Sequence, residues 1–391
     1  MRVRRWWWLA LPVLVLTLAL AACGSDDDEG GEGAAGGATT AAETGAGTTA
    51  EEPRETAKVT LQLKWVTQGQ FAGYYAALEQ GYYEDEGLDV TIKPGGPDIV
   101  PEQVVLGGQA EFGINWLDNT LATRDQGGKI VNIAQVFARS GMTELTWKDS
   151  GLEEITDLAG KKVGVWLGGN EHKLFAALTK NGLDPQKDVN IVAQPFDMNL
   201  FLNREVDAAA AMTYNELAQV LETKNDDTGE LYTLDDLNVM KMSDLGTGAL
   251  EDGIFVTEDW IADEENQDIA KRFLKASFKG WIYCRDNPDD CVQYVLDAGP
   301  TLGEGHQRWM VNEINKLIWP NESGIGVMNE EDYDTTVQIA TDYKVVKNDP
   351  GEGVYTSEYA EAAVQELEDE DVDVRGEDWE APEVEVTEGG E

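Results

Sequence analysis

The stretch Leu61–Ile92, LQLKWVTQGQFAGYYAALEQGYYEDEGLDVTI, decides the fold of this chain. Apolar and polar residues alternate over Val59–Trp65, which is the period-two pattern of a strand. A loop with Gly69 follows, and apolar residues then recur at helical spacing over Phe71–Leu78 before a second strand over Val90–Ile92. This order predicts a β-α-β unit, which joins parallel strands through a crossover helix.

The loop after the first strand is the first place to expect a ligand. Ligands of open α/β sheets bind outside the carboxyl ends of the strands, and the segment Trp65–Phe71 occupies that position. A large aromatic residue at a strand end also serves to cap a hydrophobic core. Position alone therefore leaves two interpretations of Trp65 open, a ligand contact and a core cap.

Residues 1–22 have the three parts of a secretory signal peptide. Arginines at the start precede an apolar run over Trp6–Leu20 and a small-residue cleavage site that ends at Cys23. This site, LAAC, resembles the lipobox of bacterial lipoproteins, in which the cysteine becomes the lipid-carrying N-terminus. We expect lipidation at Cys23 and an extracytoplasmic protein anchored to the cell membrane. A transmembrane helix is the alternative, but the apolar run is short for one.

Composition divides the rest of the chain. Residues 23–57 are rich in Gly, Ala, Thr and acidic residues without periodicity, which predicts a flexible tether. The folded part, about 58–367, exceeds 300 residues and favours two domains, and residues 368–391 form an acidic tail. A net charge of -46 argues against nucleic acid or anionic lipid as a partner of the folded part, because both require a basic face.

Two further cysteines, Cys284 and Cys291, flank the helix-breaking pair Asn287-Pro288. No third ligand lies near them, so a metal site is not expected. Export to an oxidising compartment favours a local disulfide over the alternative of free thiols.

The α/β rhythm continues beyond the first unit. The patterns predict strands at 111–116, 130–137, 162–167, 190–193, 206–212 and 253–257, and helices at 97–106, 117–126, 170–180, 199–204 and 215–222. Everything after Asp259 is expected to be helical. We therefore predict two α/β lobes with a helical C-terminal portion.

Several strand ends carry aromatic, amide or carboxylate side chains. They are Asn115-Trp116, Gly168-Gly169-Asn170 and Tyr214-Asn215-Glu216, with Asp252 just before the strand at 253–257. Such a set is able to sandwich a flat ring and bond its edge, and the Gly-rich turn offers backbone N–H groups to an anionic or carbonyl group. The alternative for each residue is ordinary turn chemistry.

Catalytic signatures are missing from the sequence. No G-x-S-x-G, P-loop or H-E-x-x-H motif occurs, and the two histidines, His172 and His306, have no partner signature around them. His172 follows Glu171 at a predicted helix start, where it is expected to be either a ligand donor or, more simply, a surface residue.

Four segments together resemble the solute-binding lipoproteins of bacterial ABC importers. They are 61–92, PGGPDIVPEQVVLGGQAEFGINW, KKVGVWLGGNEHKLFAAL and QPFDMNLFLNREVDAAAAMTYNE. The most similar group binds thiamine pyrimidine precursors and related heterocycles. Within this group, the riboflavin-binding branch is resembled most by three motifs, K-W-x-x-Q-x-Q-F-A-G-Y-Y, W-x-G-G-N-E and M-T-Y-N-E. The resemblance covers roughly residues 58–300.

The resemblance implies the type II periplasmic-binding fold, α/β with two lobes and a hinge that closes on ligand. The lobes would be 58–142 with 250–367, and 143–249. The implied ligand-binding residues are Trp65, Gln70, Phe71, Trp116, Gly169, Asn170, Glu171, Tyr214, Asn215, Glu216 and Asp252. The implied partners are a small heterocyclic ligand and the permease subunits of the importer, and the implied state is a monomer without cofactor or bound metal.

Fungal synthases on the same fold use a histidine and a pyridoxal-linked lysine. This chain has Gln68-Gly69-Gln70 at the first loop instead of a His-rich stretch, which favours a receptor over an enzyme. The candidate residues include carboxylates but no Arg or Lys, which disfavours an anionic ligand. The expected ligand is riboflavin or a similar flat heterocycle, and an aminopyrimidine held by Glu216 is the alternative.

Overall fold

The computed structural model describes residues 55–348 and 350–391. The expected signal peptide (1–22), the expected lipidation site Cys23 and nearly all of the expected tether (23–57) lie outside the described residues. The described fold begins at Ala57. Within the described ranges, no helix is both long enough and apolar enough to span a membrane.

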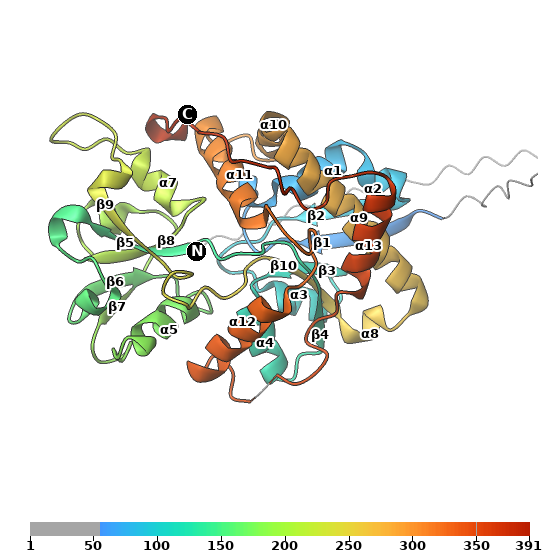
Figure 1. Ribbon diagram of the computed structural model, residues 1–391, viewed down its shortest axis with the longest axis horizontal. Coiled ribbons are helices and arrows are strands. Elements are labelled where there is room, and N and C mark those ends of the chain that lie inside the picture. Colours follow the sequence, from blue (N-terminus) through green and yellow to red (C-terminus); the bar gives the residue numbers. More distant parts are fainter. Residues whose placement is uncertain (1–54, 349) are drawn as a thin grey trace, which may run out of the picture. The chain divides into compact units, whose positions relative to one another are not determined.

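The described chain forms two sheets (Figure 1). The first has the strand order β2-β1-β3-β10-β4, made of β1 (Ala57–Gln62), β2 (Leu88–Lys93), β3 (Phe112–Asn115), β4 (Ile130–Gln135) and β10 (Gly253–Thr257). Strand β1 pairs in parallel with β2 and β3, so the β-α-β unit predicted from the sequence is confirmed. Strand β10 lies antiparallel between β3 and β4.

The second sheet has the order β7-β6-β8-β5-β9 and repeats this arrangement. Its strands are β5 (Met142–Trp147), β6 (Lys162–Val165), β7 (Asn190–Ala193), β8 (Ala208–Met212) and β9 (Leu237–Lys241). Strand β6 is parallel to β7 and β8, and β5 is antiparallel to β8 and β9. Strands β5 and β9 were not predicted from the sequence.

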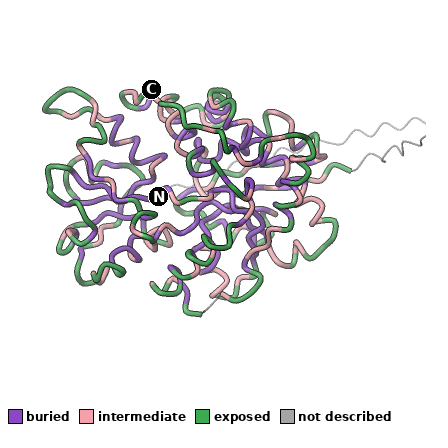
Figure 2. Tube along the Cα trace, viewed as in Figure 1, coloured by how far each residue is buried: buried purple, intermediate pink, exposed green. Residues whose placement is uncertain are grey.

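The chain crosses between the sheets through two connections, residues 136–141 after β4 and residues 242–252 after β9. We use "first lobe" for the elements around the first sheet and "second lobe" for those around the second. Strand β10 returns to the first lobe, so that lobe is built from two separate parts of the chain. The strands of both sheets are largely buried (Figure 2).

Helices cover both sheets. Those of the first lobe are α1 (Ala72–Glu79), α2 (Tyr82–Asp85), α3 (Pro101–Leu106), α4 (Leu117–Asp125), α8 (Glu258–Ile261), α9 (Glu264–Asp286), α10 (Pro288–Ala298), α11 (Glu304–Ile318), α12 (Glu330–Asp342) and α13 (Glu358–Asp369). Those of the second lobe are α5 (His172–Lys180), α6 (Asn199–Leu202) and α7 (Glu216–Leu221). The C-terminal portion is mostly helical as predicted, but residues 319–329 and 370–387 form no helix, and the helix predicted at 97–106 begins only at Pro101.

Helices α1 and α9 pack in backbone contact. A Cβ atom at Gly280 would overlap the carbonyl oxygen of Gly73, and a Cβ at Gly73 would overlap the ring of Trp281. Glycine at both positions therefore permits the close approach. The contact fixes α1, and with it the loop that precedes α1 at the end of the first strand.

The C-terminal helices are tied together covalently. A disulfide joins Cys284 of α9 to Cys291 of α10, with Asn287-Pro288 forming the break between the helices. The expected disulfide is present.

The acidic tail predicted at 368–391 packs against the folded part in several places. Val374 is buried and its carbonyl accepts from the backbone N–H of Ile325, so apolar packing and backbone pairing hold this segment down. Further on, the backbone N–H of Gly389 donates to the carbonyl of Glu222, just after α7. The tail thus connects the first lobe to the second, as Figure 1 shows at the C-terminus.

Candidate ligand-binding site

A small cavity of about 40 Å³ lies between the two lobes. The first lobe contributes residues at or just beyond the ends of β1 and β3, and the second contributes residues beyond β6, β7 and β8. The lining residues are Lys64, Trp65, Gln68, Gln70, Trp116, Trp166, Asn170, Phe196, Met212, Tyr214, Asn215 and Glu216. The carboxyl ends of parallel strands thus form both walls, as the rule for open α/β sheets requires.

The structure brings together most of the residues predicted from the sequence. Trp65, Gln70, Trp116, Asn170, Tyr214, Asn215 and Glu216 line this cavity. Gly169 and Glu171 line an adjoining, wider opening that shares Lys64, Trp65 and Asn170 with it. The N–H of Gly169 donates to the Glu171 carboxylate at 2.8 Å, so it is not free for a ligand in this structure.

Two predicted residues lie outside the lining. Phe71 is fully buried in the hydrophobic core, because it stands at the start of α1 on the side that faces the protein interior. Asp252 is buried behind Gln70, whose amide donates to it.

Aromatic rings from both lobes dominate the cavity. Trp65 of the first lobe and Phe196 of the second meet edge to face, with ring centroids 4.5 Å apart and planes at 62°. Trp166 is held by a 3.2 Å hydrogen bond from its indole N–H to the carbonyl of Pro195. These rings offer faces of the size that a flat heterocycle requires.

Trp116 lies against two lysine ammonium groups. The Nζ atoms of Lys64 and Lys173 are 4.4 Å and 3.5 Å from its ring centroid, within cation–π distance. The indole N–H of Trp116 is buried and has no hydrogen-bond partner among the described residues. The Trp116 ring is therefore held by the two ammonium groups and not by a hydrogen bond from its indole N–H.

Lys64 corrects the expectation that the cleft contains no Arg or Lys. It lines the cavity and donates to the side-chain oxygens of Asn115 at 2.8 Å and Asn170 at 3.2 Å, so it links the two lobes. Burial lowers the pKa of Lys64, and the charges of Asp252, Glu102 and Asp118 oppose that effect. Because the cavity does contain a lysine, a lack of positive charge is no longer an argument against an anionic ligand.

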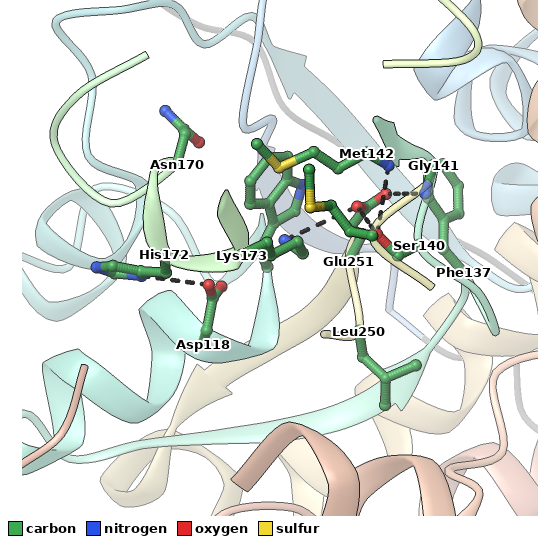
Figure 3. Close-up of polar contacts among 12 residues, drawn as sticks. Asp118, Phe137, Ser140, Gly141, Met142, Asn170, His172, Lys173, Leu250 and Glu251 are labelled. Carbon is green, nitrogen blue, oxygen red and sulfur yellow. Dashed lines mark hydrogen bonds and ion pairs between the residues drawn. The ribbon is translucent and has the colours of Figure 1, made fainter. Parts of the chain in front are cut away.

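Buried charges beneath the cavity join the second lobe to the first (Figure 3). Lys173, at the start of α5, lies 3.7 Å from the carboxylate of Glu251 in the second connection. Glu251 also accepts from the hydroxyl of Ser140 at 2.6 Å and from the N–H of Gly141 at 2.9 Å. Since Ser140 and Gly141 belong to the first connection, Glu251 ties the two connections together.

His172 takes part in the same cluster, whereas the simplest expectation was a surface residue. Its Nδ1 lies 3.2 Å from the carboxylate of Asp118 on α4 of the first lobe. Burial alone would raise the pKa of Asp118, but the charge of Lys173 and the hydrogen bond from His172 outweigh it and hold this pKa at about 2. Burial would lower the pKa of His172, but Asp118 raises it above its usual value.

The wall formed by the second lobe ends in a buried carboxylate. Glu216 accepts from the N–H of Met212 at 3.0 Å and from the side-chain amide of Asn215 at 2.8 Å. Burial nevertheless raises the pKa of Glu216 to about 7. Behind Asn215, His306 lies 3.0 Å from the amide oxygen of Asn215 and 2.9 Å from the carboxylate of Glu222, so α11 of the first lobe supports this wall.

Sequence reasoning missed Lys64, Gln68, Trp166, Phe196 and Met212 as lining residues. Trp166 directly follows β6 and Phe196 follows β7 by a short turn, so the strand-end rule that selected Trp65 and Trp116 would have found them. The alternation over Val59–Trp65 would put Lys64 on the face opposite Trp65, but β1 ends at Gln62, so the alternation does not apply to these two residues and both line the cavity.

Comparison with known proteins agrees with this geometry. A model of the NMT1/THI5-like family matches residues 68–291, which is more than half of the chain. The riboflavin-binding protein RibY of Chloroflexus aurantiacus is 25% identical over 272 residues, covering 68% of this chain and 74% of that protein. The 4-amino-5-hydroxymethyl-2-methylpyrimidine phosphate synthase of Legionella pneumophila is 26% identical over 253 residues, covering 63% of this chain and 75% of that enzyme.

The fold is also found among solved structures. The periplasmic aliphatic sulphonate binding protein SsuA of Escherichia coli superposes with a TM-score of 0.55 at 15% identity, over 75% of this chain and 89% of that one. At this identity the likeness concerns the fold alone. It confirms the two-lobed periplasmic-binding-protein architecture.

Proposed function

Because this chain belongs to the NMT1/THI5-like family, we propose that it is the substrate-binding protein of an ABC-type importer that captures riboflavin or a similar flat heterocycle. The similarity to RibY supports the ligand, and the fold supports the role. The signal-peptide pattern and the lipobox-like LAAC sequence support an extracytoplasmic protein anchored through Cys23, and the role of the fold supports the importer's permease subunits as partners.

The observation that carries the proposal is the set of three tryptophans, Trp65, Trp116 and Trp166, that both lobes bring to one cavity. Each aromatic pair adds about 0.5–1.5 kcal/mol beyond the area that it buries. Rings on both lobes would contact both faces of a planar ligand, so binding would favour closure of the lobes.

The edge of the ligand would meet amides and one cation. Gln68, Gln70 and Asn170 each carry both donor and acceptor atoms, which suits the mixed edge of an isoalloxazine. Lys64 uses part of its donor capacity on Asn115 and Asn170 and would donate to a ligand carbonyl as well.

An aminopyrimidine is the alternative ligand, and Glu216 is the residue that favours it. Its carboxylate lines the cavity and would hold an exocyclic amine by a charge-assisted bond. The similarity to a pyrimidine synthase also leaves an enzyme as the rival function. Formation of a pyrimidine product by purified protein with pyridoxal phosphate and iron would overturn the receptor assignment.

Titration of the purified protein with riboflavin tests the ligand directly, since bound flavin should lose fluorescence on contact with tryptophan. Replacing Trp65 by Ala should weaken binding at least tenfold, about 1.4 kcal/mol. Trp379→Ala is the matched control, because Trp379 does not line the cavity. Absence of flavin binding, or an unchanged affinity in the Trp65 variant, would contradict this assignment.

A further inference from the structure

A chain of three polar side chains runs from the buried interior to the cavity wall. The amide nitrogen of Gln70 donates to the carboxylate of Asp252 at 2.7 Å. The amide nitrogen of Gln68 donates to the amide oxygen of Gln70, also at 2.7 Å. Asp252 is 2% exposed, and the other two residues line the cavity.

The backbone under this chain is held in place by α11. The N–H of Gly69 donates to the side-chain oxygen of Gln307 at 2.7 Å, and the N–H of Gln70 contacts the sulfur of Met310 at 3.2 Å. The loop lies against a helix on one side and ends in α1 on the other. The two glutamine side chains therefore project from a fixed backbone.

The direction of the chain follows from the chemistry of its buried end. An ionised carboxylate accepts hydrogen bonds but cannot donate them, whereas an amide does both. Asp252 thus requires the nitrogen of Gln70 to face it, which turns the oxygen of Gln70 towards Gln68. Gln68 must in turn present its nitrogen to Gln70, and its own amide oxygen is left over.

The amide oxygen of Gln68 is left without a donor from the described part of the protein. Among the described residues, no side chain or backbone N–H donates to Oε1 of Gln68. This oxygen is also not one of the buried, unpartnered atoms, in contrast to Oδ1 of Asp252. It is therefore an accessible acceptor on a residue that lines the cavity.

We propose that Asp252 is a positioning residue that fixes the hydrogen-bond polarity of the first lobe's wall, so that the site selects heterocycles that donate an N–H to Gln68. The proposal rests on the proposed function, in that it specifies the class of ligand for the same cavity. Imides of the flavin type and exocyclic amines satisfy it, whereas an imide methylated at its nitrogen has no N–H to donate. A site built to bond an N–H rejects an analogue without it, because its own acceptor is then left unpaired.

The first test measures a ratio of affinities. Riboflavin and 3-methylriboflavin are titrated into the wild-type protein and into Asp252→Asn, in which an amide at the buried end permits the chain to reverse. The steric cost of the methyl group is the same in both proteins, so a change in the ratio reports the hydrogen bond. We expect the preference for riboflavin to fall at least fivefold in Asp252→Asn.

Glu144→Gln is the matched control, because Glu144 is a fully buried carboxyl group on β5 that does not belong to the chain. It should leave the ratio unchanged. A merely structural role of Asp252 would weaken both flavins equally, and an unchanged ratio in Asp252→Asn would overturn the proposal.

A second test needs no ligand and separates this proposal from the proposed function. In protein labelled with ¹⁵N at the glutamine side chains, Asp252→Asn should shift the amide signals of both Gln70 and Gln68, assigned through Gln70→Leu and Gln68→Leu. A shift of neither signal would refute the chain. If the wild-type protein binds no flavin but both signals move, the ligand assignment fails and the polarity of the wall stands.

Discussion

The ammonium group of Lys173 lies 3.5 Å from the centre of the Trp116 ring, so a buried cation of the second lobe supports an aromatic wall of the first. The same ammonium group is 3.7 Å from the carboxylate of Glu251. The side chain of Lys173, fully buried at the start of α5, therefore supports both the cavity wall at Trp116 and the connection between the lobes at Glu251.

Replacing Lys173 by Met should destabilise the protein by about 3–5 kcal/mol, because it leaves buried carboxylates without their cation. Denaturation by urea measures the free energy of unfolding. Lys187→Met is the control: Lys187 is 78% exposed and pairs with Asp184, and such surface pairs contribute at most about 1 kcal/mol. Equal losses in the two variants would show that the buried cluster has no special role.

Replacing Phe196 by Ala should weaken ligand binding with little effect on stability. Phe196 is 43% exposed and its edge-to-face contact with Trp65 joins the lobes beside the cavity. Loss of about 0.5–1.5 kcal/mol would lower affinity by roughly two- to twelvefold, mainly through faster dissociation. Stopped-flow measurement of the dissociation rate checks this. Leu234→Ala, at a 55% exposed residue of the second lobe away from the cavity, should leave the rate unchanged.

The pKa of Glu216, raised by burial to about 7, predicts that the protein loses stability as pH rises from about 4.5 to 7. The folded state binds this proton more tightly than the unfolded state, so the free energy of unfolding falls as the proton is released. The full effect is about 3 kcal/mol as an upper limit. Asp252, whose pKa is raised by burial to about 6, acts in the same direction.

Glu216→Gln should remove the part of this slope that belongs to Glu216, as measured by urea denaturation at several pH values. Asp118 has the opposite sign but acts only below about pH 4, because its pKa is held at about 2. Parallel pH profiles for wild type and variant would contradict the prediction.

Replacing Cys284 and Cys291 by Ser should lower the free energy of unfolding by about 2–3 kcal/mol, the loss expected for a short closed loop. Reductant should destabilise the wild-type protein by a similar amount and leave the double variant unaffected. Unfolding curves recorded with and without reductant measure both effects. A wild-type protein that does not respond to complete reduction would show that the disulfide adds nothing to stability.

The sequence was sufficient for the α/β class, the two lobes and much of the site. Strand periodicity located β1 and β6, and the strand-end rule located Trp65 and Trp116 on one cavity. Strands β5 and β9 were missed because they are held by antiparallel pairing with distant segments, which leaves a weak local pattern. Such pairing depends on tertiary context.

The polar part of the site was less accessible to sequence reasoning. Lys173 and Glu251 are far apart in the chain, and each alone is an ordinary charged residue of a helix start or a loop. Phe71 directly follows the lining residue Gln70, and the family resemblance implied it as a ligand contact, but its ring enters the core. Periodicity identifies the buried face of an element, but it does not show which buried residues meet across two lobes.

The return of strand β10 to the first sheet also constrains the order in which the protein is built. All strands of the second sheet lie between Met142 and Lys241, whereas β4 joins the first sheet only through β10, which ends at Thr257. During synthesis the second lobe is therefore the first whose sheet has emerged in full, although it comes later in the sequence. Once folded, it would bring the ends of the two connections together and shorten the loop that β10 must close. Folding of the second lobe would therefore lower the entropic cost of completing the first sheet.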